Sequence, residues 1–153
     1  MTHRRTIEIE PALRLGLEVA EDALVRIDFL PTGKASSAHP ILDVAERQLR
    51  AYFAGKLQVF DLPLKTKGTP FQENVWRLVQ AIPYRHIRTY MDLARDLNSP
   101  GAVRAVGAAN GANPLPIVIP CHRVVATGGG MGGYGGGIDL KRRLLALEGA
   151  ILL

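Results

Sequence analysis

Apolar and polar residues alternate along residues 6–30, at Leu13, Leu15, Leu17 and Val19 and again at Val25, Ile27 and Phe29. Successive side chains of a β-strand point to opposite faces of the sheet, so a period of two is typical of strands with one buried face. The pattern predicts a small antiparallel sheet in the first part of the chain.

A helical pattern follows a polar loop over residues 31–40. Its apolar residues are spaced as on the buried face of a helix, and Gly55 is placed to end that helix. They are Ile41, Leu42, Ala45, Leu49, Tyr52 and Phe53. Residues 57–68 return to an extended pattern, and we expect a boundary between two domains near residues 66–69.

The second part of the chain has a mainly helical pattern. Residues 69–72, TPFQ, offer a capping hydroxyl, a proline in the first turn and a glutamine three residues after the cap. This helix is expected to stop at Pro83. Thr89 predicts the start of a second, short helix through Leu97, and the turn at residues 98–100 predicts a third.

Two short helices joined by a tight turn are typical of a helix-turn-helix, although compact helical hairpins without DNA are at least as common. Arg104 stands in the second of these helices among small residues, AVRAVGAA. It is either a solvated or phosphate-contacting arginine, or one that a thin helix carries deep into a nucleic-acid groove.

The end of the chain combines an apolar run, a glycine-rich segment and a last helix. Residues 117–119, IVI, are expected to form a strand that leads into PCHRVV. Eight glycines within residues 128–137 predict an ordered loop instead of a regular element, because Met131 and Tyr134 lie among them. Asp139 is expected to cap the final helix, which Gly149 follows.

These elements predict an α+β fold. A small domain of sheet plus helix comes first, and a mostly helical domain follows the boundary near residues 66–69. The alternating strand pattern lies in the first domain, and the helix-capping signals lie in the second.

The net charge of +5 fits a polyanionic partner, and residues 85–153 hold 8 Lys and Arg against 4 Asp and Glu. A solvated basic surface is the alternative. No run of 18 apolar residues is present, so we expect no membrane span. A single cysteine cannot form an internal disulfide, which favours a reducing, intracellular compartment and excludes a zinc site built on several thiolates.

The one cysteine, Cys121, lies between Pro120 and the pair His122 and Arg123. A lone cysteine is more often a small buried apolar residue than a nucleophile. Neighbouring positive charge and the glycine-rich loop downstream favour a reactive thiol. In an extended chain Cys121 and His122 would point to opposite faces, so a proton transfer between them needs a local bend or a bridging water.

A base of this kind needs a group that orients it, and Glu148 is the candidate. It stands in the last turn of the final helix, where the helix dipole disfavours an anion. Glu148 is either an exposed residue that tolerates this small penalty or the partner of His122.

Six motifs in this order carry a family resemblance: TPFQxxVW, TYxxLA, AVRAVGAANGANP, IPCHRVV, GGYGGG and KRxLLxLEG. The chain resembles the O6-alkylguanine-DNA alkyltransferases, also called methylated-DNA–protein-cysteine methyltransferases. The resemblance is close over residues 69–150 and loose over the first 65. It implies a ribonuclease-H-like α/β domain over residues 1–66. It also implies a mostly helical, winged-helix-like alkyltransferase domain over residues 67–153, which would carry the helix-turn-helix, the DNA-binding residues and the active site.

The resemblance implies a catalytic role for five residues. Cys121 would accept the alkyl group from O6 of a guanine, once per molecule. His122 would act through a water as the base, and Glu148 would hold His122. Asn113 would order the turn that places the helix-turn-helix against the cysteine, and Tyr90 would bind the flipped base and donate a hydrogen bond to it.

The remaining implied sites bind guanine and DNA. The guanine pocket would be formed by Val124, Tyr134, Gly135 and Gly136. The DNA-binding residues would be Arg104, Ala102, Ala105, Asn110 and Arg123. The alkyl carbon lies inside the duplex, so the nucleotide must be extruded, and Arg104 would fill the gap that it leaves in the base stack. Small residues on the helix suit an approach through the minor groove.

The resemblance also implies partners and a location. The partner would be double-stranded DNA with O6-alkylguanine, bound in the minor groove by a monomer, with no cofactor, metal or membrane. We expect a cytoplasmic protein of a prokaryote, associated with the nucleoid when it acts. The sequence departs from the family at Arg85, where glycine is usual, at Met91, where glycine or glutamine is common, and at Arg143, where an aromatic is common.

Three rival interpretations belong to other classes of protein. A non-catalytic binder of damaged DNA with the same shape would lack the cysteine. A cysteine hydrolase using Cys121 and His122 would turn over repeatedly and need no DNA. A helix-turn-helix regulator would leave PCHRV and the glycine-rich loop unexplained.

Overall fold

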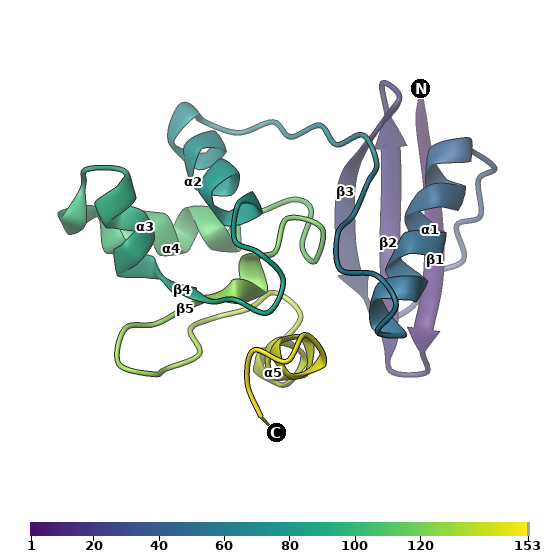
Figure 1. Cartoon of the computed structure of the whole chain (residues 1–153). Coiled ribbons are helices and arrows are strands. Elements are labelled where there is room, and N and C mark those ends of the chain that lie inside the picture. The colour runs from purple at the N-terminus through teal and green to yellow at the C-terminus, as the bar shows by residue number, and fades with distance from the viewer. Residues whose placement is uncertain (153) are drawn as a thin grey trace. The chain divides into compact units, whose positions relative to one another are not determined.

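The computed structural model describes residues 1–152 and contains the two compact units Met1–Thr66 and Lys67–Leu153 (Figure 1). The first is a sheet with one helix, and the second is mainly helical. The predicted α+β class is confirmed. No helix within residues 1–152 is long and apolar enough to cross a membrane.

The sheet of the first unit is antiparallel, with strands β1 (Thr2–Glu10), β2 (Leu13–Ala20) and β3 (Ala23–Leu30) in that order. Buried and half-buried residues alternate along all of β2, as the period of two predicts. The turn between β2 and β3 is made by Glu21 and Asp22, both with positive φ, which is the geometry of a tight hairpin turn. β1 begins at Thr2, before the alternation of the sequence becomes visible.

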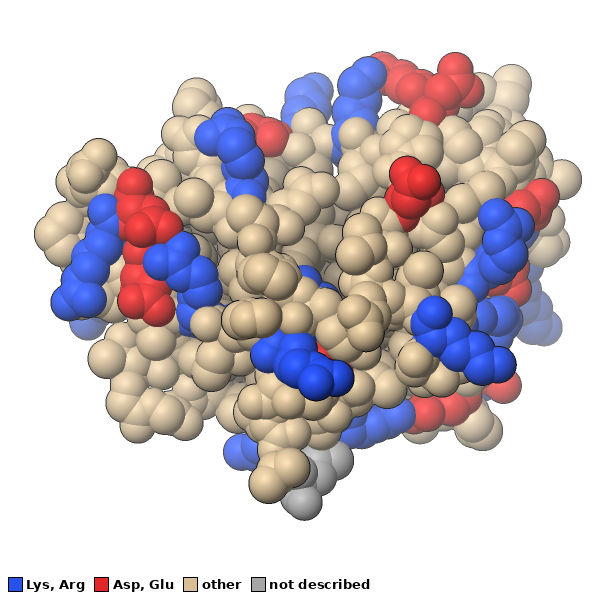
Figure 2. Space-filling model, viewed as in Figure 1, with Lys and Arg blue, Asp and Glu red and all other residues tan. Residues whose placement is uncertain are grey.

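Helix α1 (Pro40–Phe53) packs against all three strands (Figure 1). Its buried residues Leu42, Ala45, Leu49 and Tyr52 were all expected on the apolar face. The imidazole of His39 caps the helix, accepting a hydrogen bond from the amide of Ile41 at 3.1 Å. Figure 2 shows acidic and basic side chains in small groups scattered over the face, and in this unit several form ion pairs such as Arg4 with Glu18.

The first two helices of the second unit begin where the sequence predicts. α2 (Pro70–Gln80) and α3 (Tyr90–Asp96) both start with a complete capping box, made by Thr69 with Gln72 and by Thr89 with Asp92. The turn after α3 enters a short 3-10 helix, η1 (Pro100–Ala102), before α4 (Val103–Gly111). α2 packs on α4, and the indole of Trp76 donates to the carbonyl of Ala109 at 2.8 Å.

Two expectations for the last third of the chain are wrong. Residues 117–119 form a turn instead of a strand, and Ile117 has φ of 74°, which no strand accommodates. Helix α5 (Ile138–Leu147) starts after Gly137, and no side chain caps it. Asp139 lies inside the first turn, where its charge still suits the helix dipole. The two-residue strands β4 (Arg88–Thr89) and β5 (Val124–Val125) pair in parallel.

Candidate active site

Cys121 is delivered to the interior of the second unit by a tight turn that Asn113 holds. The Asn113 amide nitrogen donates to the carbonyl of Ile119 at 2.8 Å, and its oxygen accepts from the amide of Leu115 at 2.9 Å. The chain then forms one turn of 3-10 helix, η2 (Cys121–Arg123). The bend that the sequence required between Cys121 and His122 is therefore present, and Cys121 is only 6% exposed.

The surroundings of the Cys121 thiol favour its protonated form at rest. Burial raises its pKa, while the Asn113 side chain and the positive charge of Lys141 lower the pKa by smaller amounts. A buried thiol of this kind needs a base before it becomes the nucleophilic thiolate.

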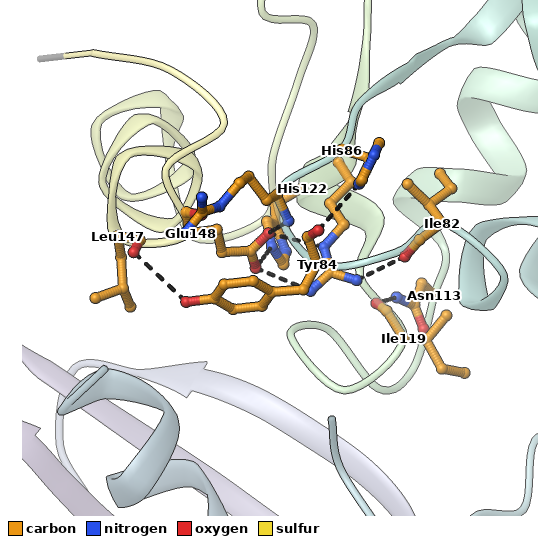
Figure 3. A network of polar contacts seen from close by, with 10 residues as sticks. Ile82, Tyr84, His86, Asn113, Ile119, His122, Leu147 and Glu148 are labelled. Carbon is orange, nitrogen blue, oxygen red and sulfur yellow. Dashed lines mark hydrogen bonds and ion pairs between the residues drawn. The ribbon is translucent and has the colours of Figure 1, made fainter. Parts of the chain in front are cut away.

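His122 and Glu148 form a buried pair at the end of α5. The imidazole Nε2 lies 2.6 Å from Oε2 of Glu148, and both side chains are fully buried. Figure 3 shows the two side chains facing each other, with the Tyr84 hydroxyl directed to the carbonyl of Leu147. No residue in the described part of the chain hydrogen-bonds to Nδ1 of His122. With the proton on Nε2, Nδ1 is a free acceptor.

Arg123 completes the network around Glu148. Its Nε donates to Oε1 of Glu148 at 2.8 Å and its Nη2 to Oε2 at 3.0 Å. Its Nη1 donates to the carbonyl of Ile82 at 2.7 Å. The guanidinium of Arg123, which the sequence analysis assigned to DNA binding, is buried and bound on both sides within the protein.

Burial, and to a smaller extent the Arg123 guanidinium, favour the neutral form of His122. Burial lowers the pKa of His122 below its ordinary value, Glu148 opposes this, and the positive charges of Arg123 and Lys141 add to the lowering. Arg123 neutralises the carboxylate that would otherwise attract a second proton to the imidazole. His122 is therefore neutral at neutral pH, as a base must be.

The two tyrosines expected at the site both lie near the Cys121–His122 turn, Tyr90 beside Cys121 and Tyr134 beside His122. Tyr90 is the first residue of α3 and is half-buried; burial and the nearby Cys121 raise the pKa of its hydroxyl. The loop passes so close to Tyr90 that a Cβ on Gly132 would overlap the hydroxyl. The ring of Tyr134 stands edge-on to His122, with 6.4 Å between centroids.

The other predicted site residues fall into a buried and an exposed group. Val124 is fully buried in β5, and Gly135 and Gly136 lie in the turn that precedes α5. Asn110, which the sequence analysis assigned to DNA binding, is only 4% exposed, and its amide donates to the carbonyl of Cys121 at 3.3 Å.

The three remaining residues of the predicted DNA-binding set belong to the helix-turn-helix. Arg104 and Ala105 are exposed on α4, and Ala102 is half-buried at the end of η1. The sequence predicts that these residues lie on a helix with small side chains. In the structure Arg104 and Ala105 are accessible on α4, and Ala102 is partly accessible just before it.

Lys141 is a residue that sequence reasoning missed. It is fully buried in α5 and its ammonium donates to three backbone carbonyls. The signal was its position: Lys141 precedes Leu144 and Leu145 by three and four residues, which places a lysine on the apolar face of a helix. Within residues 1–152 no group of three or more His, Cys, Asp and Glu side chains is placed to hold a metal ion.

Comparison with known proteins identifies the family of the chain. The model of the DNA-binding domain of 6-O-methylguanine DNA methyltransferase matches residues 70–150. A methylated-DNA–protein-cysteine methyltransferase of Mycolicibacterium paratuberculosis is 55% identical over 104 residues, which make up 68% of this chain and 63% of that protein. One from Mycobacterium bovis is 54% identical over 154 residues, covering 97% of this chain and 93% of that protein.

A solved relative extends the agreement to the fold. The crystal structure of Mycobacterium tuberculosis OGT in complex with DNA superposes with a TM-score of 0.86 and 43% sequence identity, covering 95% of this chain and 92% of that chain. Fold and site together define a two-unit α+β protein with a buried cysteine site and a helix-turn-helix. The chain belongs to the family of methylated-DNA–protein-cysteine methyltransferases.

Proposed function

We propose that this protein repairs alkylated DNA by transferring the alkyl group from O6 of guanine to Sγ of Cys121. The observation that carries the proposal is the buried network behind the thiol. His122 follows Cys121 in the same helical turn, its Nε2 is held by Glu148, and its Nδ1 is left as an acceptor. The names of the relatives, methylated-DNA–protein-cysteine methyltransferases, support the same chemistry.

The reaction is an in-line displacement at the alkyl carbon. The thiol proton passes through a water to Nδ1 of His122, and the thiolate forms the new S–C bond while the C–O6 bond breaks. The electron pair of that bond moves into the guanine, which Tyr90 protonates as negative charge develops. His122 and Tyr90 then return to their resting states by proton exchange with solvent.

The protein acts once per molecule in this proposal. The product on Cys121 is a thioether, and a thioether offers water no good leaving group. The thiol is therefore consumed, and the protein is a stoichiometric transferase.

DNA enters through the exposed face of α4. The target nucleotide leaves the base stack, which costs least at a damaged pair, and Arg104 fills its place. Val124, Tyr134, Gly135 and Gly136 surround the extruded guanine. The protein binds as a monomer in the minor groove, and its contacts with phosphates are independent of sequence, as repair requires.

The proposal is tested with duplex DNA that carries labelled O6-methylguanine, followed by intact-mass measurement. One added methyl group on Cys121, with activity lost after one equivalent, is expected, and the Cys121→Ala variant gains none. Repeated turnover, label on another residue, or binding without transfer would contradict the proposal and favour the rival classes.

The role of Arg104 is tested separately with two substrates. Arg104→Ala should slow the reaction with duplex DNA far more than the reaction with free O6-benzylguanine, because the free base needs no extrusion. Equal losses on both substrates would count against the role in filling the stack.

A further inference from the structure

The ammonium group of Lys141 joins three segments of the second unit. It lies 2.7 Å from the carbonyl oxygen of Val124 in β5, 2.5 Å from that of Met131 and 3.2 Å from that of Gly133. These three acceptors use the three N–H donors of the ammonium. Lys141 itself is fixed in α5, so one side chain connects a helix, a strand and the glycine-rich loop of residues 128–137.

This loop needs an external anchor. It contains no helix or strand, and its glycines lose more backbone entropy on ordering than any other residue would. Backbone bonds hold only its ends, from the amide of Ala126 to Gly130 and from the amide of Gly137 to Tyr134. The bonds from Lys141 to Met131 and Gly133 fall between those ends.

The anchored part of the loop is the part that lies at the proposed active site. Gly132, between the two acceptors in the loop, is the position where a Cβ would overlap the hydroxyl of Tyr90. The ammonium itself lies 5.9 Å from the centroid of the Tyr90 ring. A displacement of residues 131–133 would therefore change the pocket that Tyr90 and Cys121 share.

A lysine is not the residue that stability alone would select here. Its three partners are neutral carbonyls, and burial lowers the pKa of Lys141 to about 8. Burying a charge that no carboxylate balances disfavours folding, and an apolar side chain on this helix face would avoid that penalty. The lysine is explained if the ordered loop matters for the reaction.

We infer that Lys141 is a positioning residue that clamps the glycine-rich loop against β5 and α5 and so builds the wall of the pocket next to Cys121. This inference rests on the proposed function. In this role Lys141 acts through the backbone of Met131 and Gly133. Its positive charge also lowers the pKa of Cys121, and that effect leaves the hydrogen exchange of the loop unchanged.

The test compares Lys141→Met with Arg142→Met. Lys141→Met removes the ammonium group and keeps a side chain of similar length. Arg142→Met is the control, because it removes an exposed cation from the neighbouring position of the same helix. In Lys141→Met, hydrogen exchange of the amides of residues 130–134 should rise by about tenfold or more, because the loop loses two hydrogen bonds from a charged group. The single-turnover rate with O6-benzylguanine should fall by about the same factor or more, with the Kd for duplex DNA unchanged.

The outcomes separate the clamp from the proposed function. A wild-type protein that accepts no alkyl group contradicts the proposed function, while hydrogen exchange still tests the clamp. A reactive wild type, together with unchanged loop exchange and rate in Lys141→Met, or equal changes in Arg142→Met, overturns the clamp. If Lys141→Met does not fold, Lys141→Gln replaces it in the test, because glutamine keeps two N–H donors without the charge. Its loop exchange should be measurably faster than in wild type, and its alkylation rate measurably slower.

Discussion

His122, Glu148 and Arg123 share one buried site, and the two neighbours of His122 affect the protonation state of its imidazole. Glu148 bonds both to the imidazole and to the guanidinium of Arg123, so its charge is already balanced within the protein. A carboxylate without that partner would attract a proton to His122 and convert the base into an acid. In the proposed reaction, the order of residues in PCHRV thus supplies a nucleophile, its base and a cation that favours the neutral form of that base.

The lowered pKa of His122 predicts how rate and stability depend on pH. As pH falls below 6.5, the ordinary pKa of His122, the unfolded chain binds a proton that the folded protein still excludes. The free energy of unfolding should therefore decrease below that pH, down to the folded pKa. The alkylation rate should stay level down to pH 6.5 and fall only below it, and single-turnover kinetics between pH 5 and 8 measure this. A fall that begins well above that pH would show a charged resting histidine.

Substitution of Arg123 tests its effect on the base. Arg123→Gln removes the charge that balances Glu148, so the pKa of His122 should rise and the acid limb of the rate profile should move to higher pH. Arg123→Lys keeps the charge and should leave the acid limb near its wild-type position, although its stability will fall with the lost fork of hydrogen bonds. Identical profiles for the two variants would reject the electrostatic role.

Arg85 offers a residue-scale test of backbone strain. It has φ of 75°, in the left-handed region that favours glycine, and its Nε donates to the carbonyl of Glu148 at 3.2 Å. Arg85→Ala loses this bond and keeps the positive φ, whereas Arg85→Gly loses the bond and relieves the strain. We expect Arg85→Gly to be more stable than Arg85→Ala by about 1 kcal/mol in urea unfolding. Equal stabilities would mean that the loop adjusts its backbone.

At the scale of elements, the two capping boxes have matched chemistry and different neighbours. Thr69 starts α2, and Thr89 starts α3, whose first residue is Tyr90. Either threonine replaced by alanine should lower the free energy of unfolding by about 1 kcal/mol. Only Thr89→Ala should also slow alkylation, by roughly three- to tenfold, because it loosens the helix start that holds Tyr90. Equal alkylation rates for the two variants would show that the cap at Thr89 does not position Tyr90 for the reaction.

The elements show which parts of the fold the sequence predicts. Local signals were sufficient for the starts of α2 and α3 and for the period-two strands, because capping and alternation act within a few residues. The run at residues 117–119 was misassigned because its β-branched residues favour a strand, and the turn depends on Asn113 bonding to Leu115 and Ile119. Positive φ at Ile117 has no local sequence signal.

The candidate site divides in the same way. The contact of His122 with Glu148 was expected from the family motifs, and the structure has it. Arg123 and Asn110 were assigned to DNA because their burial depends on packing among segments far apart in the sequence. Lys141 escaped notice for the same reason, since its three acceptors lie in residues 124–133 and are joined only by the fold.

At the scale of the whole molecule, the net charge belongs to one unit. Residues 1–66 hold 9 Lys and Arg against 9 Asp and Glu, whereas residues 67–153 hold 10 against 5, which accounts for the whole net charge of +5. Arg123 and Lys141 are buried, so the other basic residues of the second unit are the ones available to phosphates. The first unit contributes no net attraction to a polyanion.

This asymmetry predicts a difference between two exposed arginines. Arg95 lies on α3, the first helix of the helix-turn-helix, which in such motifs crosses the DNA backbone, and Arg47 lies on α1 of the first unit. The logarithm of the DNA-binding constant should fall linearly with the logarithm of salt concentration, and Arg95→Ala should reduce that slope by about 0.9, the value of one phosphate contact. Arg47→Ala should leave the slope unchanged, because its unit has no net charge with which to hold the duplex. Titrations of one undamaged duplex over several salt concentrations measure both slopes, and an equal reduction in both variants would mean that the duplex also contacts the first unit.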